Sequence, residues 1–143
     1  MATLERSALV TYSAAQMYAL VNDVDAYSDF LPWCAGSQTL ERGSDYYVAR
    51  VDIKKGPISQ HFTTRNQVVE PETIVMSLVD GPFKSLNGQW RFREIDNLGC
   101  KVSFSIDFAF SNFLLEKTLS PVFSEICTRM VDAFVARAKE VYR

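Results

Sequence analysis

The sequence has few residues of the kind that form disulfide frameworks or metal sites. Its three cysteines, Cys34, Cys100 and Cys127, are widely spaced and include no C-x-x-C pair. An odd number of separated cysteines argues against a disulfide framework and against a zinc site, and it suits a reducing compartment such as the cytoplasm. The one histidine, His61, is expected on the outer face of a strand, where it would be neither a metal ligand nor a catalytic base.

The sequence also lacks the local motifs of common enzymes. It contains no phosphate-binding loop, dinucleotide fingerprint, G-x-S-x-G elbow or H-E-x-x-H zinc motif. Asp and Glu fall mostly in expected loops and on helix surfaces, so no pair of carboxylates is a candidate for acid and base. Cys34 has no identified base that would activate its thiol. We therefore expect no catalysis, no metal and no bound cofactor.

Neither a strong net charge nor a long apolar run is present. The formal net charge is −2 and the pI is near 5.4, which argues against DNA as a partner. No stretch approaches the ~20 apolar residues that span a bilayer, and residues 1–7 do not resemble a signal peptide. We expect a cytoplasmic protein without an integral membrane segment, and transient contact with a membrane surface stays open.

What the sequence does contain is enough apolar material for one domain. A chain of 143 residues fits a single domain, residues 1–143, and its 48% hydrophobic content supplies one core. Aromatic residues make up 13% of the chain, which is more rings than packing alone requires in a domain of this size. This excess hints at a pocket.

Two short helices are expected after a first strand at residues 4–11. Ser13 and Gln16 have the capping-box spacing, in which each side chain bonds the free backbone amide of the other residue. Apolar residues then recur at helical spacing. A second short helix around residues 25–30 should end before Pro32, because the residue before a proline is displaced from the helical region.

From residue 36 to residue 110 the hydrophobic period changes to two. Turn signals divide this stretch into six strands. Apolar side chains share one phase along each strand, and that phase should face the core. Basic side chains in the opposite phase should face solvent, namely Arg50, Lys54, Arg65, Arg91, Arg93 and Lys101.

The last segment has the apolar spacing of a long amphipathic helix. It begins near Ser111 and Asn112, is interrupted or kinked at Pro121, continues to Tyr142, and carries Val141 on its apolar face. The part after the proline would span ~31 Å. Such a helix must cover an apolar surface, and a curved antiparallel sheet with one apolar face provides it. The pattern therefore predicts an α+β fold.

Two segments resemble the signatures of a known family. Residues 23–34, DVDAYSDFLPWC, are similar to the D-V-x-x-Y-P-x-F-L-P-W-C motif of the coenzyme-Q-binding START-like family, in the polyketide cyclase/dehydrase superfamily, with Ser28 in place of the usual proline. Residues 80–92, DGPFKSLNGQWRF, resemble its second motif, G-P-F-x-x-L-x-G-x-W-x-F. The likeness extends over essentially the whole chain and is greatest to the bacterial RatA subgroup, named for a ribosome-association toxin.

The resemblance implies a helix-grip (START-like, Bet v 1-like) fold, in which a curved seven-stranded antiparallel sheet surrounds a long C-terminal helix and two short helices follow the first strand. It implies a hydrophobic ligand, a polyprenyl quinone such as ubiquinone, held between the sheet and that helix by a carrier or chaperone that supports respiration. A RatA-type toxin that binds the large ribosomal subunit and blocks subunit association is the alternative. A cyclase or lyase is a second alternative.

The candidate ligand-binding residues are inward apolar and aromatic side chains with two inward polar ones. For the side chains beside Pro32, the alternative is that they only dock the short helices on the sheet. Thr64 and Asn66 would bond a headgroup such as a quinone carbonyl, or pair with backbone or water, since a buried polar group needs a partner. Phe83 lies in an expected turn. Three roles are open for its ring: an entrance lid, a contact with a partner, or packing back onto the core. The full set is Tyr27, Phe30, Leu31, Trp33, Phe62, Thr64, Asn66, Met76, Phe83, Leu86, Trp90, Phe104, Phe108, Phe123, Ile126, Met130 and Phe134.

The outward basic residues are the candidate ribosome contact. Together Arg50, Lys54, Arg65, Arg91, Arg93 and Lys101 would form a basic stripe on an acidic protein. Such a stripe is suited to the phosphates of ribosomal RNA. The alternative is that these residues are ordinary solvated charges.

Overall fold

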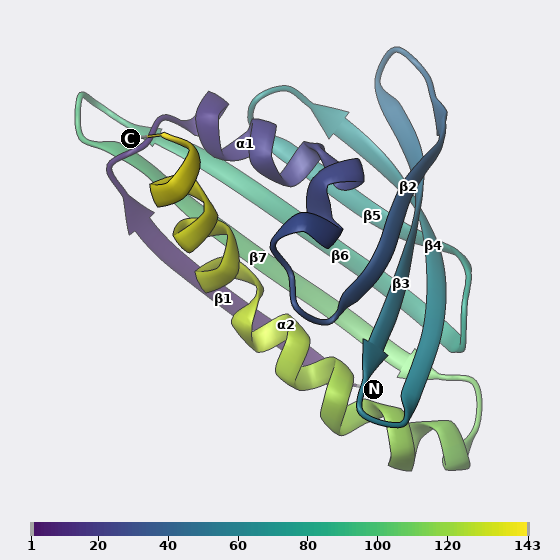
Figure 1. Ribbon diagram of the computed structural model, residues 1–143. Coiled ribbons are helices and arrows are strands. Elements are labelled where there is room, and N and C mark those ends of the chain that lie inside the picture. The colour runs from purple at the N-terminus through teal and green to yellow at the C-terminus, as the bar shows by residue number, and fades with distance from the viewer. Residues whose placement is uncertain (1, 143) are drawn as a thin grey trace.

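The computed structural model describes residues 2–142, and its elements follow in the predicted order (Figure 1). The first strand and the two short helices are β1 (Ala2–Val10), α1 (Ala14–Asn22) and the 3-10 helix η1 (Val24–Asp29). The chain continues as β2 (Cys34–Arg42), β3 (Tyr46–Lys55), β4 (Ile58–Val69), β5 (Thr73–Asp80), β6 (Phe83–Ile95), β7 (Gly99–Phe110) and α2 (Phe113–Val141).

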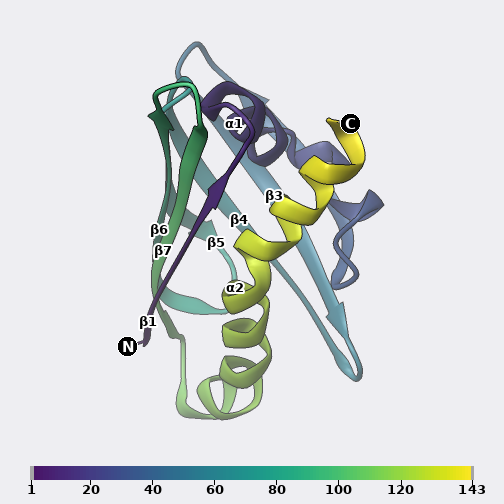
Figure 2. The same cartoon turned by 90° about the vertical axis from the view of Figure 1, so that its left-hand side faces the viewer.

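The strands form one antiparallel seven-stranded sheet in the order β1-β7-β6-β5-β4-β3-β2. The first strand pairs with the last, and the other strands form a meander. The sheet curves around α2, which crosses its concave face (Figures 1 and 2). These features confirm the predicted α+β helix-grip fold.

The start of α1 is fixed by the predicted capping box. The Ser13 hydroxyl oxygen accepts a hydrogen bond from the Gln16 amide at 3.1 Å, and the Gln16 side chain accepts one from the Ser13 amide at 2.9 Å. These two bonds satisfy backbone donors that a helix start otherwise leaves free. The apolar face that follows buries Met17 and Val21 against the sheet.

The prediction for Pro121 was an interruption or a kink, and α2 is continuous through this residue, so the interruption does not occur. Pro121 has no amide hydrogen, so one helical hydrogen bond is missing at this residue. About one turn earlier, the Thr118 hydroxyl donates a hydrogen bond to the Leu114 carbonyl at 2.9 Å, a contact that often accompanies a bend in a helix. The axis bends along its length (Figures 1 and 2). The placement of Val141 on the apolar face was wrong, because Val141 is 47% exposed and the stripe ends at buried Ala138. No helix among residues 2–142 is long and apolar enough to cross a membrane.

Several aromatic rings pack together where α2 begins to cross the sheet. Phe83, Phe108, Phe110 and Phe123 form what we call the aromatic cluster, with ring centroids between 4.8 and 6.4 Å apart. The α2 backbone comes closest to β1, β7 and α1. Strands β2–β5 lie farther from the helix, and the space between contains side chains and a cavity.

A candidate ligand cavity between the sheet and α2

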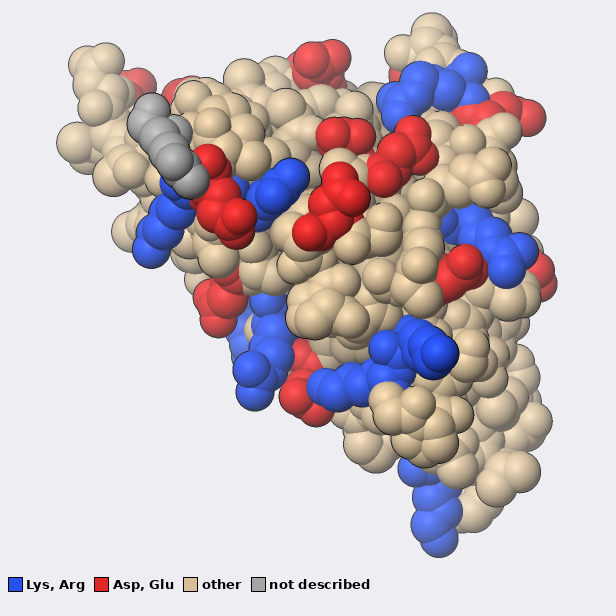
Figure 3. All heavy atoms as spheres, in the orientation of Figure 1, with Lys and Arg blue, Asp and Glu red and all other residues tan. Residues whose placement is uncertain are grey.

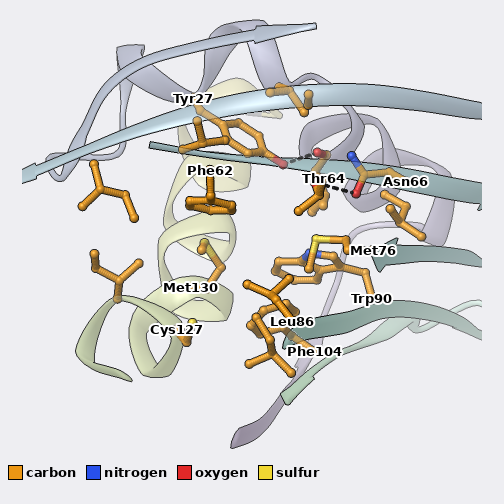
Figure 4. Close-up of a pocket in the computed structure, with 18 of the residues that line it drawn as sticks. Tyr27, Phe62, Thr64, Asn66, Met76, Leu86, Trp90, Phe104, Cys127 and Met130 are labelled. Atoms are coloured by element: carbon orange, nitrogen blue, oxygen red, sulfur yellow. Dashed lines mark hydrogen bonds between the residues drawn. The ribbon is translucent and has the colours of Figure 1, made fainter. Parts of the chain in front are cut away.

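The cavity is enclosed by the concave face of the sheet, α1, η1 and the middle of α2 (Figure 4). Inward side chains of β3 to β7 form one wall, because alternate residues of a strand point to the same face. The opposite wall comes from one face of α2, with Phe123, Ile126, Met130 and Phe134 at helical spacing. Elements far apart in the sequence thus meet around one apolar space.

The space left open inside these walls is small. Its volume is about 70 Å³, whereas an engineered protein cavity that takes up benzene has about 150 Å³. A larger ligand therefore requires the walls to move. Met76 and Met130 are half-buried members of the wall, and their unbranched side chains repack more easily than aromatic rings.

Two buried polar side chains interrupt the apolar wall. Thr64 is 5% exposed and Asn66 is 3% exposed, and both point into the cavity from β4 (Figure 4). The Thr64 hydroxyl donates a hydrogen bond to the Asn66 side-chain oxygen at 3.1 Å. Each is therefore a partner of the other, and neither side chain bonds the backbone among the described residues. Among the described residues none accepts a hydrogen bond from the Asn66 amide nitrogen, which is left free to donate to a ligand oxygen.

The wall carries no charge near neutral pH. Among residues 2–142 the lining contains no Asp, Glu, Lys, Arg or His. Burial raises the pKa of the Cys127 thiol to about 12 and raises the pKa of the Tyr47 hydroxyl, so both keep their protons. Burial also raises the pKa of Tyr27 well above its usual value, and its hydroxyl donates to the Val21 carbonyl. The lining is suited to an uncharged ligand.

Most of the predicted ligand-binding residues lie around this cavity. They come from η1 and the loop after it, from β4 to β7 and from α2, and they line the cavity, as Figure 4 shows for the residues that it labels. The set consists of Tyr27, Trp33, Phe62, Thr64, Asn66, Met76, Leu86, Trp90, Phe104, Phe123, Ile126, Met130 and Phe134. Their position is settled, and their contact with a ligand stays a prediction.

The structure places the other predicted residues away from the cavity. The ring of Phe30 packs against Phe134 at 5.4 Å, with the Arg137 guanidinium 4.8 Å from its centroid. Leu31 is 1% exposed in a small core under η1. Phe83 and Phe108 belong to the aromatic cluster. Phe83 is folded onto the core with 7% exposure, because burying its ring is more favourable than leaving it in a turn.

A second hollow adjoins the cavity at the aromatic cluster. We call it the outer hollow, and it lies between the β3–β4 hairpin and the first half of α2, with about 20 Å³ open. Ile53, Phe62, Phe123 and Ile126 line both spaces, so they form the partition between them. The rings of Phe62 and Phe123 lie 5.9 Å apart in this partition. Lys55 and Glu125 form an ion pair of 3.0 Å between the hairpin and α2.

Several lining residues were not among the predicted site residues. Tyr47 shares the strand phase of Ala49 and Val51, so the period of two already indicated that it points inward. Cys127 follows Ile126 on α2 and lies on the same broad face. Val21 and Val24 reach the cavity from α1 and η1, and no sequence spacing indicates that these helix ends close it.

The outward basic residues do not form one stripe. Arg50 pairs with Asp52 at 2.9 Å, and the Arg65 guanidinium lies 3.9 Å from the Tyr46 ring centroid. On the other side of β5, Arg93 lies opposite Lys101 and Arg91 opposite Ser103. The outward side chains of β5 between these two groups include exposed Val75 and Val79. Lys54 is exposed near the β3–β4 turn.

No cluster that could hold a metal is found within residues 2–142. Three or more His, Cys, Asp or Glu side chains do not come together anywhere in this part of the chain. The three cysteines are buried, separate and unoxidised.

Sequence comparison identifies the family to which this chain is similar. Residues 10–135 match the family described as polyketide cyclase / dehydrase and lipid transport. The chain is 50% identical over 142 residues to the ribosome association toxin RatA of Escherichia coli, covering 99% of this chain and 90% of that protein. It is 29% identical over 136 residues to the mitochondrial coenzyme Q-binding protein COQ10 of Drosophila melanogaster, covering 92% of this chain and 56% of that protein.

A solved structure agrees with the fold. The crystal structure of the Zhui aromatase/cyclase from a Streptomyces species matches with a TM-score of 0.88, covering 99% of this chain and 96% of that one. The two sequences are 18% identical, so the likeness concerns the fold alone.

Proposed function

The chain belongs to the polyketide cyclase/dehydrase and lipid transport family, and from this premise we propose that it binds an apolar small molecule, a polyprenyl quinone such as ubiquinone, between the sheet and α2. In this role it would be a carrier or chaperone that supports respiration. The observation that carries the proposal is the uncharged, nearly all-apolar cavity with one free amide donor. The similarity to a coenzyme Q-binding protein supports the choice of ligand class.

The chemistry of the wall suits the two parts of a prenylated quinone. The prenyl tail would gain about 0.8 kcal/mol for each carbon group removed from water, so affinity should rise with tail length. The quinone oxygens are acceptors, and the Asn66 amide nitrogen is a donor that has no partner among the described residues. A carbonyl placed there would satisfy both groups in a water-poor site.

Entry of such a ligand requires the cavity to expand. The outer hollow offers the direction, because the partition side chains line both it and the cavity, namely Phe62, Phe123, Ile53 and Ile126. Rotation of Phe62 and Phe123 would join the two spaces into one channel that opens between the hairpin and α2. A long tail would then follow this channel outward.

We also propose that the chain is not an enzyme. The tyrosine and cysteine groups that face the cavity have raised pKa values, so none would act as a base near neutral pH. The absence of Asp, Glu and His from the described lining supports the same view. A substrate-dependent reaction abolished by Tyr27→Phe would contradict this proposal.

The test of ligand binding starts from protein purified from its native cells. A solvent extract examined by mass spectrometry should contain a polyprenyl quinone in an amount that scales with the protein. A protein of similar size purified in parallel serves as the control for carry-over. An extract without quinone, together with no saturable uptake of added quinone, would reject the proposal.

A second candidate function is association with the large ribosomal subunit. It is favoured by the 50% identity to the ribosome association toxin RatA over nearly the whole chain, and it would require a cytoplasmic location. The exposed group of Arg91, Arg93 and Lys101 is the candidate contact, because its like charges lie side by side without a paired carboxylate among the described residues.

Sedimentation with purified large subunits tests this second function. We expect binding that weakens as salt rises and that is lost in the Arg91→Glu, Arg93→Glu double variant. The Arg50→Glu variant is a matched control, since Arg50 is already neutralised by Asp52. No sedimentation at low salt, or equal loss in the control, would reject the contact.

A further inference from the structure

Two large apolar side chains project into solvent at the start of α2. Phe113 is 79% exposed and Leu114 is 68% exposed. They follow the capping residue Asn112, whose side chain bonds the Leu115 amide at 2.9 Å and so holds this first turn in a fixed orientation. We call Phe113 and Leu114 the apolar tip.

The helix does not bury the apolar tip because its inward stripe begins one turn later. Leu119 and Phe123 are the first buried residues of α2. The ammonium of Lys117 lies 5.9 Å from the Phe113 ring centroid, on the outward side of the same turn. Exposed apolar side chains beside a lysine are typical of protein surfaces that enter the lipid headgroup region.

The apolar tip lies at the same end of the molecule as the outer hollow. The start of α2 and the turn of the β3–β4 hairpin lie at one end in both views (Figures 1 and 2). Ile58 of the hairpin and Leu119 of α2 line the outer hollow between them. The β5–β6 turn lies there too, since the Pro82 carbonyl accepts a bond from the Ser111 amide at 3.0 Å.

The end that carries the apolar tip also carries exposed lysines. Lys54, Lys84 and Lys117 are exposed here and form no ion pair among residues 2–142. The carboxylates at this end are Asp80, the last residue of β5, Glu116 in the first turn of α2, and Glu125, which is paired with Lys55. Acidic side chains lie over η1, which carries exposed Asp25 and Asp29, and basic side chains lie both toward the end where α2 begins and elsewhere on the same face (Figure 3). The unpaired lysines at this end would be attracted to an anionic surface.

We propose that this end docks on a lipid bilayer containing anionic lipids, with the apolar tip inserted among the headgroups and Lys117, Lys84 and Lys54 facing lipid phosphates. A bilayer accounts for both the exposed apolar tip and the exposed lysines, because inserted apolar area and nearby lysines each strengthen binding to an anionic lipid surface. Docking brings the outer hollow to the bilayer, where an apolar ligand resides.

The test measures sedimentation with vesicles of phosphatidylcholine, with and without phosphatidylglycerol, and without any quinone. The result therefore does not depend on the proposed cavity ligand. We expect binding to the anionic vesicles that falls roughly tenfold or more in the Phe113→Gln, Leu114→Gln double variant, since the inserted apolar area is lost. Lys117→Gln should reduce it about fivefold on anionic vesicles only.

The chain offers a closely matched control. Leu9 and Leu98 are 73% and 72% exposed at the opposite end of β1 and β7, so the Leu9→Gln, Leu98→Gln double variant removes similar exposed apolar area elsewhere. It should bind vesicles as the wild type does. Equal urea midpoints for all proteins show that folding is intact.

Three results would overturn the proposal. The wild-type protein does not sediment with anionic vesicles, or both double variants lose binding equally. The third is that the apolar-tip variant keeps vesicle binding and loses sedimentation with large ribosomal subunits, which would assign this end to the ribosome.

Discussion

Helix α2 packs against the sheet in two different ways along its length. At the aromatic cluster, rings of α2, β6 and β7 contact one another edge-to-face or stacked, with Phe108 only 1% exposed. Farther along, the same helix faces a cavity walled by Met76, Met130 and the polar pair of Thr64 and Asn66. Both regions are apolar, and they differ in how completely the side chains fill the space.

The difference follows from the sequence of β4 to β6. In the aromatic cluster, large rings face each other across neighbouring strands. For example, Phe83 of β6 lies opposite Phe110 of β7. In the cavity wall, Gly88 on β6 lies opposite Met76 on β5 and contributes no side chain, while β4 contributes short polar groups. One region therefore stabilises the fold, and the other keeps a space that a ligand could enlarge.

The largest expected effect comes from truncating a ring of the aromatic cluster. Phe108→Ala should lower the free energy of unfolding by ~3–5 kcal/mol, because a fully packed region cannot collapse into the void. Met130→Ala, beside the existing cavity and half-buried, should cost clearly less. Urea unfolding of both variants measures this, and equal losses would show that the two regions are packed alike.

The next effect concerns the polar pair. Asn66→Leu removes the acceptor of the Thr64 hydroxyl and should lower the free energy of unfolding by ~1–3 kcal/mol. Adding Thr64→Val should recover most of this loss. Both variants should bind a prenylated quinone about tenfold more weakly, while binding of a prenyl hydrocarbon without oxygens stays the same. Equal weakening for both ligands would show that the pair is structural only.

A smaller effect is expected at Gly88. A Cβ here would lie 2.4 Å from the terminal methyl of Met76, so Gly88→Ala should push that flexible side chain into the cavity. Quinone affinity should fall by about threefold to tenfold, with unfolding free energy changed by less than ~1 kcal/mol. Titration with quinone and urea unfolding provide the two measurements. A large loss of stability without weaker binding would place the strain in the sheet instead.

The smallest effect is expected at the ion pair beside the outer hollow. A hydrogen bond and charge from Lys55, with a further contribution from Arg129, lower the pKa of Glu125 below its usual 4.5. Because the folded-state pKa is depressed, the stabilisation is present above 4.5 and is lost as the pH falls through the lowered value. The wild type should therefore be slightly more stable than Glu125→Gln near neutral pH, and the two should converge in acid. Unfolding midpoints across this range would detect an opposite trend.

The sequence predicted the regular parts of this molecule well. Alternation by two placed Ala49, Leu86, Trp90 and Phe104 on the inner face, and the spacing of Ser13 and Gln16 predicted the helix start, because these patterns are local. It left open whether Phe83 folds inward, and it did not decide whether Leu31 and Phe30 line the cavity or lie behind its wall. Such positions depend on how turns and helix ends pack against distant strands.

The size of the cavity was equally out of reach of the sequence. Counting aromatic residues suggested a pocket, but the open volume depends on the small difference between the enclosed space and the side chains within it. The outward basic residues were placed correctly on the surface. Their separation into two groups arises from apolar side chains on β5 and from local pairing such as Arg50 with Asp52.

The most direct test of ligand binding uses the two tryptophans of the chain. Trp33 and Trp90 both line the cavity, and quinones quench indole fluorescence at close range. Titration with a short-chain ubiquinone should give saturable quenching at one ligand per chain. Ala49→Leu, which fills the cavity from β3, should abolish it, whereas Ala35→Leu on the exposed face of β2 should not. Quenching that rises linearly without saturation, and equally in both variants, would contradict a ligand site between the sheet and α2.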